Sequence, residues 1–348
     1  MSKKWLDAMS LSHQCKEGQP LATLTDEQIA SLKISNFLFH VVHHGKDDPE
    51  YFDDVPLGKF EPFFVARIKD TLKGNRFSFL DDSSVRVEIL KWQDKKITFL
   101  ELSKVLAFQF NEFYDKRVTL GVLIVIELLA GEKRYYSLIK YDSDEVVSFT
   151  RSGAKAVLAD VVNNFTQSAK SLQKSALIDL EAVAGEGHVA VIDRQTRSSI
   201  SDIFRKFLGV VRTKKPAELT DSLHKAVIRI VSKHKDDFPS SFTYRAGDQV
   251  REIAEKQKEF NADEFYDQFF GAYGNDEIRA SYQKEISYQG LIGEVFEYVP
   301  EALPEVRKFR YKTQEGILIT VPPGASDTLK ISPDGKTITI STSKVNEI

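Results

Sequence analysis

Residues 120–141 read LGVLIVIELLAGEKRYYSLIKY, in which two apolar runs flank a short polar turn. The first run, Leu120–Leu129, is rich in Val, Ile and Leu, and the second, Arg134–Tyr141, is rich in Tyr and aliphatic residues. Both compositions are typical of strands, and the turn at Ala130–Lys133 is short enough for the strands to pair directly. We therefore expect an antiparallel β-hairpin in this segment.

The residues before this hairpin mix strand and helix patterns. Ile34–Val42 (ISNFLFHVV) is an apolar run with strand composition. Pro62–Lys73 repeats apolar residues at four-residue steps and is followed by Gly74, as expected of a helix and its end. Ser103–Tyr114 is a second helix candidate, whereas Ser84–Trp92 fits either a helix or a strand. The first part of the chain is therefore predicted to be α+β.

The middle of the chain has helical periodicity. Its strongest pattern is SSISDIFRKFLG at 198–209, where apolar residues recur at three- and four-residue spacing. We expect Ser199 as the N-cap, Asp202 as the capping-box acid and Gly209 as the end of this helix. Pro216 can occupy the first turn of a following amphipathic helix. Further expected elements are helices at 154–172, 248–258, 261–273 and 275–284, and a short strand at 189–192.

The C-terminal end returns to strand patterns. Three short apolar runs are separated by turn residues, and the last turn, Pro333–Lys336 (PDGK), is a strong turn signal. A C-terminal β-hairpin is therefore expected. The predicted organisation is an N-terminal extension at 1–28, an α+β domain at 29–150, a helical region at 151–305 and C-terminal β-strands at 306–348.

Composition limits the class of protein. The 348 residues, of which 42% are hydrophobic and 28% charged, are typical of a globular chain of one large or two ordinary domains. No apolar run reaches the roughly 18 residues that a membrane helix needs, and the N-terminus lacks an apolar signal core, so we expect a cytosolic protein. The single cysteine, Cys15, excludes an intramolecular disulfide framework and a Cys-rich zinc site.

Charge is distributed unevenly along the chain. The net charge of −3 excludes a uniformly basic protein, and residues 47–54 hold five acids in eight positions. Residues 194–235 hold eleven Lys and Arg against three acids, a local net of +8. Such asymmetry indicates a charged partner, and ten of the bases are the candidate DNA-contacting residues: Arg194, Arg197, Arg205, Lys206, Arg212, Lys214, Lys215, Lys225, Arg229 and Lys233.

Three of these candidates share one side of the helix expected after Pro216. Lys225, Arg229 and Lys233 lie four residues apart and so form a stripe, while the apolar residues of that helix lie on another face. Such a stripe could neutralise phosphates along a duplex with little regard to base sequence. The alternative is a solvated helix face that pairs with acidic side chains.

Motifs for catalysis are weak. His40, His43 and His44 precede Asp47 and Asp48, but on a strand His40 and His43 would point to opposite faces. The chain has no HExxH, no Walker motif, no GxGxxG and no Glu-x-Lys tripeptide. We therefore expect no enzyme activity, no cofactor and no metal site.

The order of several segments resembles the bacterial nucleoid-associated protein family of the NdpA/YejK type. The closest stretch is RSSISDIFRKFLG followed by LHKAV, and further similar segments are VARIKDTLKGNRFSFLDDSS, ITFLELSKVL and EGILITVPPG…LKISPDGKTITIS. They run in family order from about Ile34 to Thr342. The resemblance implies a cytosolic, nucleoid-located DNA-binding homodimer without catalysis, and it favours a helix at 84–92.

Together these observations predict a largely sequence-independent double-stranded DNA-binding protein that acts through a basic helical surface. The helical region 151–305 is expected to bind DNA and to form the homodimer, with residues 194–235 lining a shared groove. Two alternatives remain open. One is a protein-interaction component of a DNA-linked or phage-defence complex, and the other is a metal-dependent nuclease.

Overall fold

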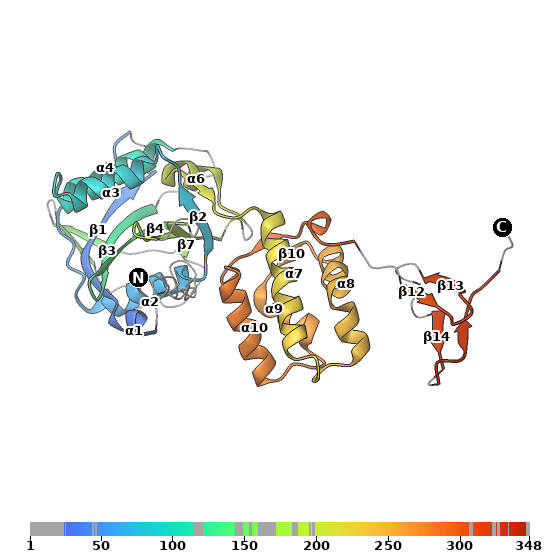
Figure 1. Cartoon of the computed structure of the whole chain (residues 1–348). Coiled ribbons are helices and arrows are strands. Elements are labelled where there is room, and N and C mark those ends of the chain that lie inside the picture. Colours follow the sequence, from blue (N-terminus) through green and yellow to red (C-terminus); the bar gives the residue numbers. More distant parts are fainter. Residues whose placement is uncertain are drawn as a thin grey trace, which may run out of the picture.

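The structure, a computed structural model, describes most of the chain from residue 24 onward. The described residues are 24, 26–43, 45, 47–113, 121–142, 149–152, 155–158, 172–182, 187–194, 196, 199–305, 309–321, 325, 328–332 and 334–345. They form a sheet unit, a helical unit and two C-terminal β-hairpins (Figure 1).

A seven-stranded sheet forms the centre of the first unit, in the order β1-β3-β4-β7-β8-β2-β9, and every neighbouring pair is antiparallel. The expected hairpin is confirmed as β3 and β4, which pair without interruption from Gly121 opposite Asp142 to Ala130 opposite Lys133. The strands are β1 (Lys33–Val42), β2 (Asn75–Phe79), β3 (Gly121–Ala130), β4 (Lys133–Asp142), β7 (Leu172–Ile178), β8 (Val189–Asp193) and β9 (Val210–Arg212).

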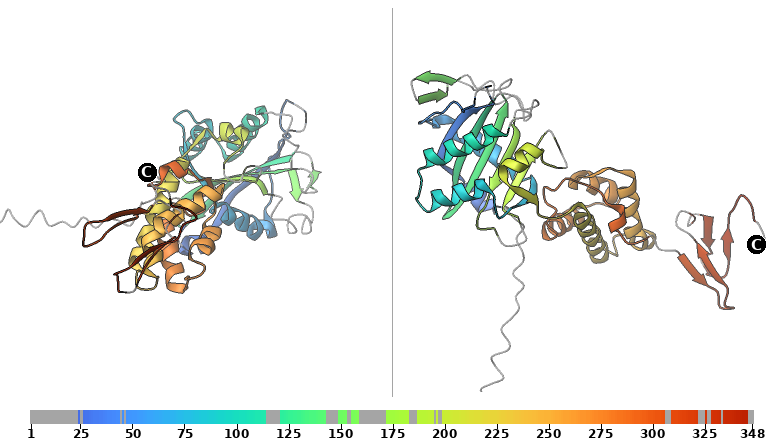
Figure 2. Two further views of the ribbon diagram at one scale, coloured as in Figure 1. Left: turned by 90° about the vertical axis from the view of Figure 1, so that its right-hand side faces the viewer. Right: turned by 90° about the horizontal axis from the view of Figure 1, so that it is seen from above.

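Helices cover both faces of this sheet, so the first unit has three layers (Figures 1 and 2). One face carries α3 (Ser84–Gln93), α4 (Phe99–Glu112) and α6 (Asp202–Leu208), and the other carries α1 (Asp26–Ser31) and α2 (Glu61–Thr71). The ambiguous segment at 84–92 is therefore helical, as the family resemblance implied. One continuous apolar core runs from Leu24 to Val210 and includes both helical layers.

The second unit is helical and has its own core, which runs from Leu219 to Leu303. No helix in the described part of the chain has both the length and the apolar character that crossing a membrane requires. The elements are α7 (Pro216–Lys233), α8 (Ser240–Lys256), α9 (Ala262–Phe270), α10 (Asp276–Tyr288), the small sheet of β10 (Glu259–Phe260) and β11 (Phe296–Glu297), and the short helix η3 (Pro300–Ala302).

A buried carboxylate joins the two units. Glu294 accepts hydrogen bonds from the backbone N–H of Arg76 at 2.9 Å and from the guanidinium of Arg212 at 2.5 Å. Beside it, Asn75 Oδ1 accepts the N–H of Val295 at 2.7 Å. Burial raises the pKa of Glu294, and the two arginines oppose that shift by stabilising the carboxylate. A loop of the helical unit is thereby fixed to strand β2.

The C-terminal segment forms two separate hairpins. β12 (Phe309–Lys312) pairs with β13 (Leu318–Val321), and β14 (Leu329–Ile331) pairs with β15 (Ile338–Ile340). The expected hairpin around Asp334–Lys336 is thus confirmed, whereas β12 was not expected. In Figure 1 and in the right-hand view of Figure 2 these strands lie apart from the helical unit.

The helix expected at 154–172 is wrong at both described ends. Lys155–Leu158 forms β6, which pairs with β5 (Phe149–Ser152), and Leu172 begins β7. Residues 159–171 lie outside the described residues. A short segment whose apolar side chains have helical spacing can also form a strand when a neighbouring strand provides hydrogen-bond partners for its backbone. The spacing within the segment does not reveal whether such a neighbour exists.

The division into units also differs from the expected boundary between residues 150 and 151. β7, β8, α6 and β9 complete the core of the sheet unit, and the helical unit begins only at Pro216. The reason is strand pairing: β2 lies between β8 and β9, so three short runs that are far apart in the sequence provide one another's hydrogen-bond partners.

Two helix starts differ as well. α6 follows Ser201, not Ser199, and Ser201 forms no side-chain cap; its backbone N–H instead donates to Asp193 Oδ2 at 2.9 Å. Gly209 ends α6 as expected, with a positive φ of 62°. α8 begins at Ser240, eight residues earlier than expected, because its first turns also contribute buried residues to the core.

Candidate nucleic-acid interface

The candidate DNA-contacting residues do not form one continuous helical surface. They begin at the end of β8 in the sheet unit and continue to the last turn of α7 in the helical unit. In chain order, Arg194 follows β8, Arg197 lies outside the described residues, Arg205 and Lys206 lie on α6, Arg212 ends β9, Lys214 and Lys215 precede α7, and Lys225, Arg229 and Lys233 lie on α7.

The helix α6 combines a fully buried aromatic face with exposed cations. Phe204 and Phe207 are both 0% exposed and stack with ring centroids 6.1 Å apart, so they belong to the core of the sheet unit. Arg205 forms an exposed ion pair with Asp202 at 2.8 Å, and Lys206 is exposed beside it. This helix therefore anchors the segment and places two cations at the surface.

Two of the candidates between β9 and α7 make contacts within the protein. The side chain of Arg212 is only 15% exposed and donates to Glu294 and to the backbone oxygen of Val295, the latter at 2.8 Å. Lys214 Nζ donates to the backbone oxygen of Gln289 at 2.8 Å. Both contacts hold the start of α7 against the loop that follows α10, so these side chains position the helical unit.

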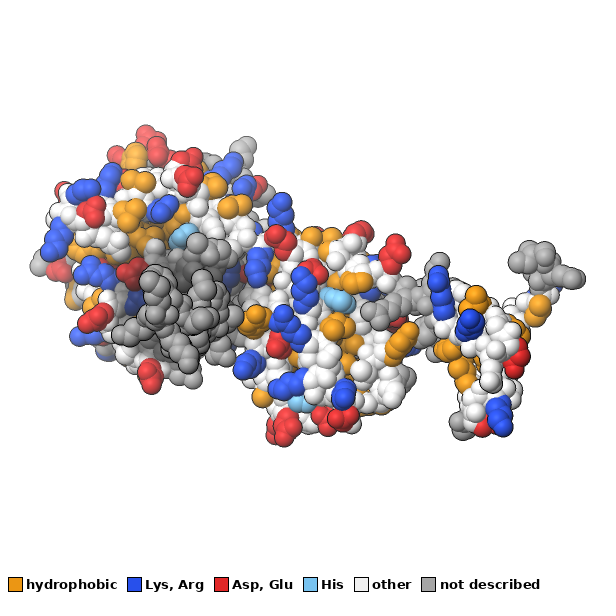
Figure 3. Space-filling model, in the orientation of Figure 1, with side chains coloured by type: hydrophobic (Ala, Val, Ile, Leu, Met, Phe, Trp, Pro, Cys, Tyr) orange, Lys and Arg blue, Asp and Glu red, His pale blue; other side chains and the backbone are white. Residues whose placement is uncertain are grey.

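The stripe on α7 is exposed, opposite the residues that this helix buries. In Figure 3, Lys and Arg side chains are spread over the visible face of α7 and α10. Lys225 is 58% exposed and forms an ion pair with Asp221 at 2.6 Å. Lys233 Nζ donates to the hydroxyl of Ser281 on α10 at 2.8 Å. Each of these cations therefore has a polar neighbour, one on α7 and one on α10.

Arg229 connects the stripe to α10. It is 51% exposed, forms an ion pair with Glu285 at 3.5 Å, and its guanidinium lies 5.0 Å from the ring centroid of Tyr288. Lys284 is exposed and lies four residues before Tyr288, so it shares this side of α10. Sequence reasoning missed Lys284 because α10 lies far from the basic segment along the chain. The α7–α10 face is defined here by four cations: Lys225, Arg229, Lys233 and Lys284.

A serine, a histidine and an aspartate form a hydrogen-bonded chain at the end of α7. Ser281 Oγ lies 2.8 Å from His234 Nε2, and His234 Nδ1 lies 3.1 Å from Asp237 Oδ2. The order resembles that of a catalytic triad. However, Ser281 is 7% exposed, lies within a helix and accepts a hydrogen bond from Lys233. Because helical backbone N–H groups are already bonded and offer no oxyanion hole, we interpret this chain as a contact that joins α7 to α10.

His40 on β1 and His43, which directly follows that strand, have structural partners. His40 is fully buried; its Nδ1 accepts the backbone N–H of Phe52 at 3.2 Å and its Nε2 lies 2.9 Å from Ser103 Oγ. Burial lowers the pKa of His40 to about 3, so the ring is neutral at pH 7. His43 Nε2 lies 3.0 Å from the backbone oxygen of Phe110. Among the described residues, no group of three or more His, Cys, Asp or Glu side chains is arranged to hold a metal ion.

The comparison with known proteins identifies the family. The model of the family described as nucleoid-associated protein YejK matches residues 39–341, from β1 to the residue after β15. No curated protein matches the chain. Because the family match covers most of the chain and includes both units and the C-terminal hairpins, the chain belongs to the bacterial nucleoid-associated protein YejK family and has a nucleoid-associated role.

Proposed function

We propose that the protein binds double-stranded DNA, largely independently of base sequence, through the α7–α10 face. The observation that supports this most is the row of exposed cations that two packed helices hold in place. From Lys225 to Lys233 the row extends about 12 Å along the helix, which corresponds to three or four nucleotides of one strand at about 3.4 Å each. Lys and Arg contacts to phosphates release counterions and do not depend on base identity.

The other candidates lie outside this face. Arg194, Arg205, Lys206 and Lys215 are exposed, and we assign them secondary phosphate contacts. Arg212 and Lys214 hold the junction between the units and so act by positioning α7. The remaining candidate, Arg197, lies outside the described residues.

We also propose that the protein is a homodimer in its DNA-binding form. A chain with a net charge of −3 needs its basic surface concentrated to hold a polyanion. Two copies related by a twofold axis would present two α7–α10 faces to one duplex, and linked sites gain avidity without new contacts.

Reversing the charge of Lys225, Arg229 and Lys233 with glutamate is expected to weaken duplex binding to a similar extent for unrelated sequences. If all three contact phosphates, the slope of log K against log[salt] should become shallower by about 0.9 for each contact, or about 2.7 in total. Fluorescence anisotropy with labelled duplexes at several salt concentrations measures both quantities.

The matched control reverses Lys91, Lys96 and Lys104, which lie in the sheet unit and form ion pairs with Glu88, Asp94 and Asp53. This control changes the net charge by the same amount and should leave most of the slope intact. Equal losses in the two triple variants would show that overall charge, not the α7–α10 face, governs binding.

The acids beside the stripe offer a test in the opposite direction. Replacing Asp221 by Asn and Glu285 by Gln removes the anions that compete with phosphates for Lys225 and Arg229. Exposed ion pairs are worth about 0.2–1 kcal/mol each, so removing the acids of two pairs should raise affinity about twofold to thirtyfold. The control is Glu88→Gln with Asp94→Asn, which removes the acids of two ion pairs in the sheet unit. Unchanged affinity in the first variant would contradict the proposed face.

A further inference from the structure

The C-terminal hairpins have almost no core of their own. Among the side chains of 310–345 whose burial the structure describes, Val321 is the one buried apolar side chain, whereas Ile317, Leu318 and Ile340 are 60%, 70% and 54% exposed. An isolated two-stranded hairpin is at best marginally stable in water, and such exposed apolar side chains indicate a contact surface. The segment therefore needs a second surface to cover it.

The most exposed apolar side chains lie at one end of the first hairpin. β12 and β13 pair from Phe309 opposite Val321 to Lys312 opposite Leu318, and Gly316, with a φ of 95°, allows the tight turn between them. Ile317 and Leu318 follow that turn directly. The hairpin tip thus presents two large aliphatic side chains to solvent.

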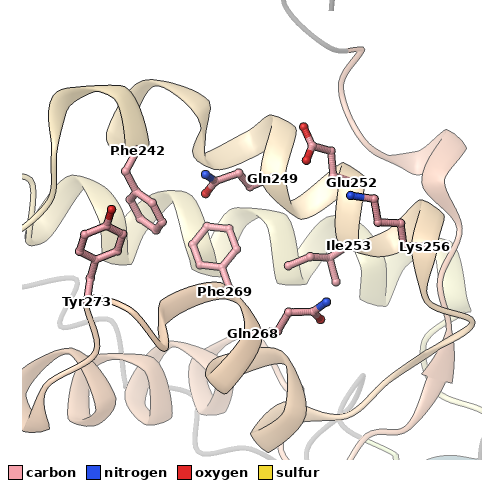
Figure 4. Close-up of a pocket in the computed structure, with 8 residues that line it drawn as sticks. All are labelled: Phe242, Gln249, Glu252, Ile253, Lys256, Gln268, Phe269 and Tyr273. Carbon is pink, nitrogen blue, oxygen red and sulfur yellow. The ribbon is translucent and has the colours of Figure 1, made fainter. Parts of the chain in front are cut away.

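A groove of complementary character lies between α8 and α9. Its volume is about 280 Å³, just below the roughly 300–1,000 Å³ of small-molecule pockets, so it suits protruding side chains better than a large ligand. Figure 4 shows the rings of Phe242, Phe269 and Tyr273 at one end, Ile253 further along, and polar side chains at the edge. Those polar side chains are Gln249, Glu252, Lys256 and Gln268.

Charge also matches the hairpins to the helical segment that forms the groove. Residues 306–345 contain seven Lys and Arg and three acids, a net of +4, whereas residues 248–268, which include most of α8 and α9, contain seven acids and three bases, a net of −4. Complementary charge of this kind guides association and fixes orientation. DNA would also attract the basic hairpins, but it would not bury Ile317 and Leu318.

We propose that the tip of the β12–β13 hairpin, Ile317 and Leu318, inserts into the α8–α9 groove of a second copy of this chain, and that the second copy does the same in return. Arg251 on α8 donates to the backbone oxygens of Leu303 at 2.6 Å and Pro304 at 3.1 Å, so the chain leaves the helical unit at a defined point. Beyond that point the hairpins lie clear of their own helical unit (Figures 1 and 2). Reciprocal exchange of an identical element gives a closed twofold dimer, and this contact deepens the proposed homodimer.

Light scattering coupled to gel filtration, without DNA, tests this contact on the full chain. At micromolar concentration the parent should have twice the monomer mass of 39.5 kDa, and the double variant Ile317→Asp, Leu318→Asp should have the monomer mass. The control, Ile331→Asp with Thr339→Asp, adds the same charge to the second hairpin and should remain dimeric. A monomeric parent, or a dimeric tip variant, would overturn the proposal.

A mixing experiment separates exchange between copies from folding back within one copy. Filling the groove with Gln249→Trp and Gln268→Trp should also give a monomer, because the partner's tip can no longer enter. Mixing the tip variant with the groove variant restores one complete contact, so heterodimers should form. Monomers that persist in the mixture at all concentrations tested would exclude the exchange.

Duplex binding by the tip variant is measured separately, so that the two proposals can fail independently. We expect the tip variant to bind the duplex more weakly, because each copy then binds alone. The slope of log K against log[salt], counted for each bound copy, should stay the same. A tip variant that stays dimeric but loses DNA affinity would instead place the hairpins on the DNA and overturn the dimer contact.

Discussion

Replacing Glu294 by alanine is expected to lower the free energy of unfolding by about 3–5 kcal/mol, because it leaves buried cationic groups without their anion. Glu294 is 4% exposed and contacts Arg212, whose side chain is 15% exposed, and the backbone of the buried Arg76. Burial already lowers the pKa of Arg76 to about 10, and Glu294 opposes that shift. Urea unfolding followed by circular dichroism measures the loss.

The control for this change is Glu297→Ala. Glu297 lies three residues later, is 56% exposed and forms an ion pair with Lys258 at 3.4 Å. Such a surface substitution should change stability by less than about 0.5 kcal/mol. If the two alanine variants unfold alike, Glu294 does not hold the units together.

Replacing Phe207 by alanine is expected to cost about 3–5 kcal/mol, because it opens a cavity in the core of the sheet unit. The ring centroid of Phe207 lies 4.7 Å from the ring centroid of Phe110 on α4 and 6.4 Å from that of Phe113. It therefore holds α6 against α4 within the helical layer that both helices share. Thermal and urea unfolding both report this loss.

The neighbouring Lys206 provides the control for Phe207. Lys206→Ala removes an exposed cation from the same turn of α6 and should leave the unfolding midpoint nearly unchanged. A Phe207→Ala variant that melts like the parent and loses only DNA affinity would make the ring a surface anchor.

Elements with strong local patterns could be predicted from the sequence. The strand β1 and the hairpin of β3 and β4 have apolar runs of strand composition, and the helix α7 has apolar residues at helical spacing. The segment at 84–92 shows the limit of this reasoning, since its spacing fits two structures and only the family resemblance favoured the helix that α3 forms.

The candidate interface was predicted only as a set of charges. The spacing of Lys225, Arg229 and Lys233 correctly places them on one exposed side of α7. Their neighbours Glu285 and Ser281 come from α10, about fifty residues later, and helix packing brings them together. No local pattern indicates which distant acid will stand beside a given cation.

The local secondary structure and the position of the basic segment can thus be read from the sequence, because side-chain periodicity and turn chemistry act over a few residues. Which distant segments contact one another cannot be read in this way. β2 pairs with β8 and β9, Glu294 meets Arg76 and Arg212, and Lys284 joins the stripe on α7 only because the folded backbone brings remote residues within hydrogen-bond or packing distance. Contacts of that kind depend on the whole core, and so the tertiary structure alone divides the basic segment into residues that hold the units together and residues that face solvent.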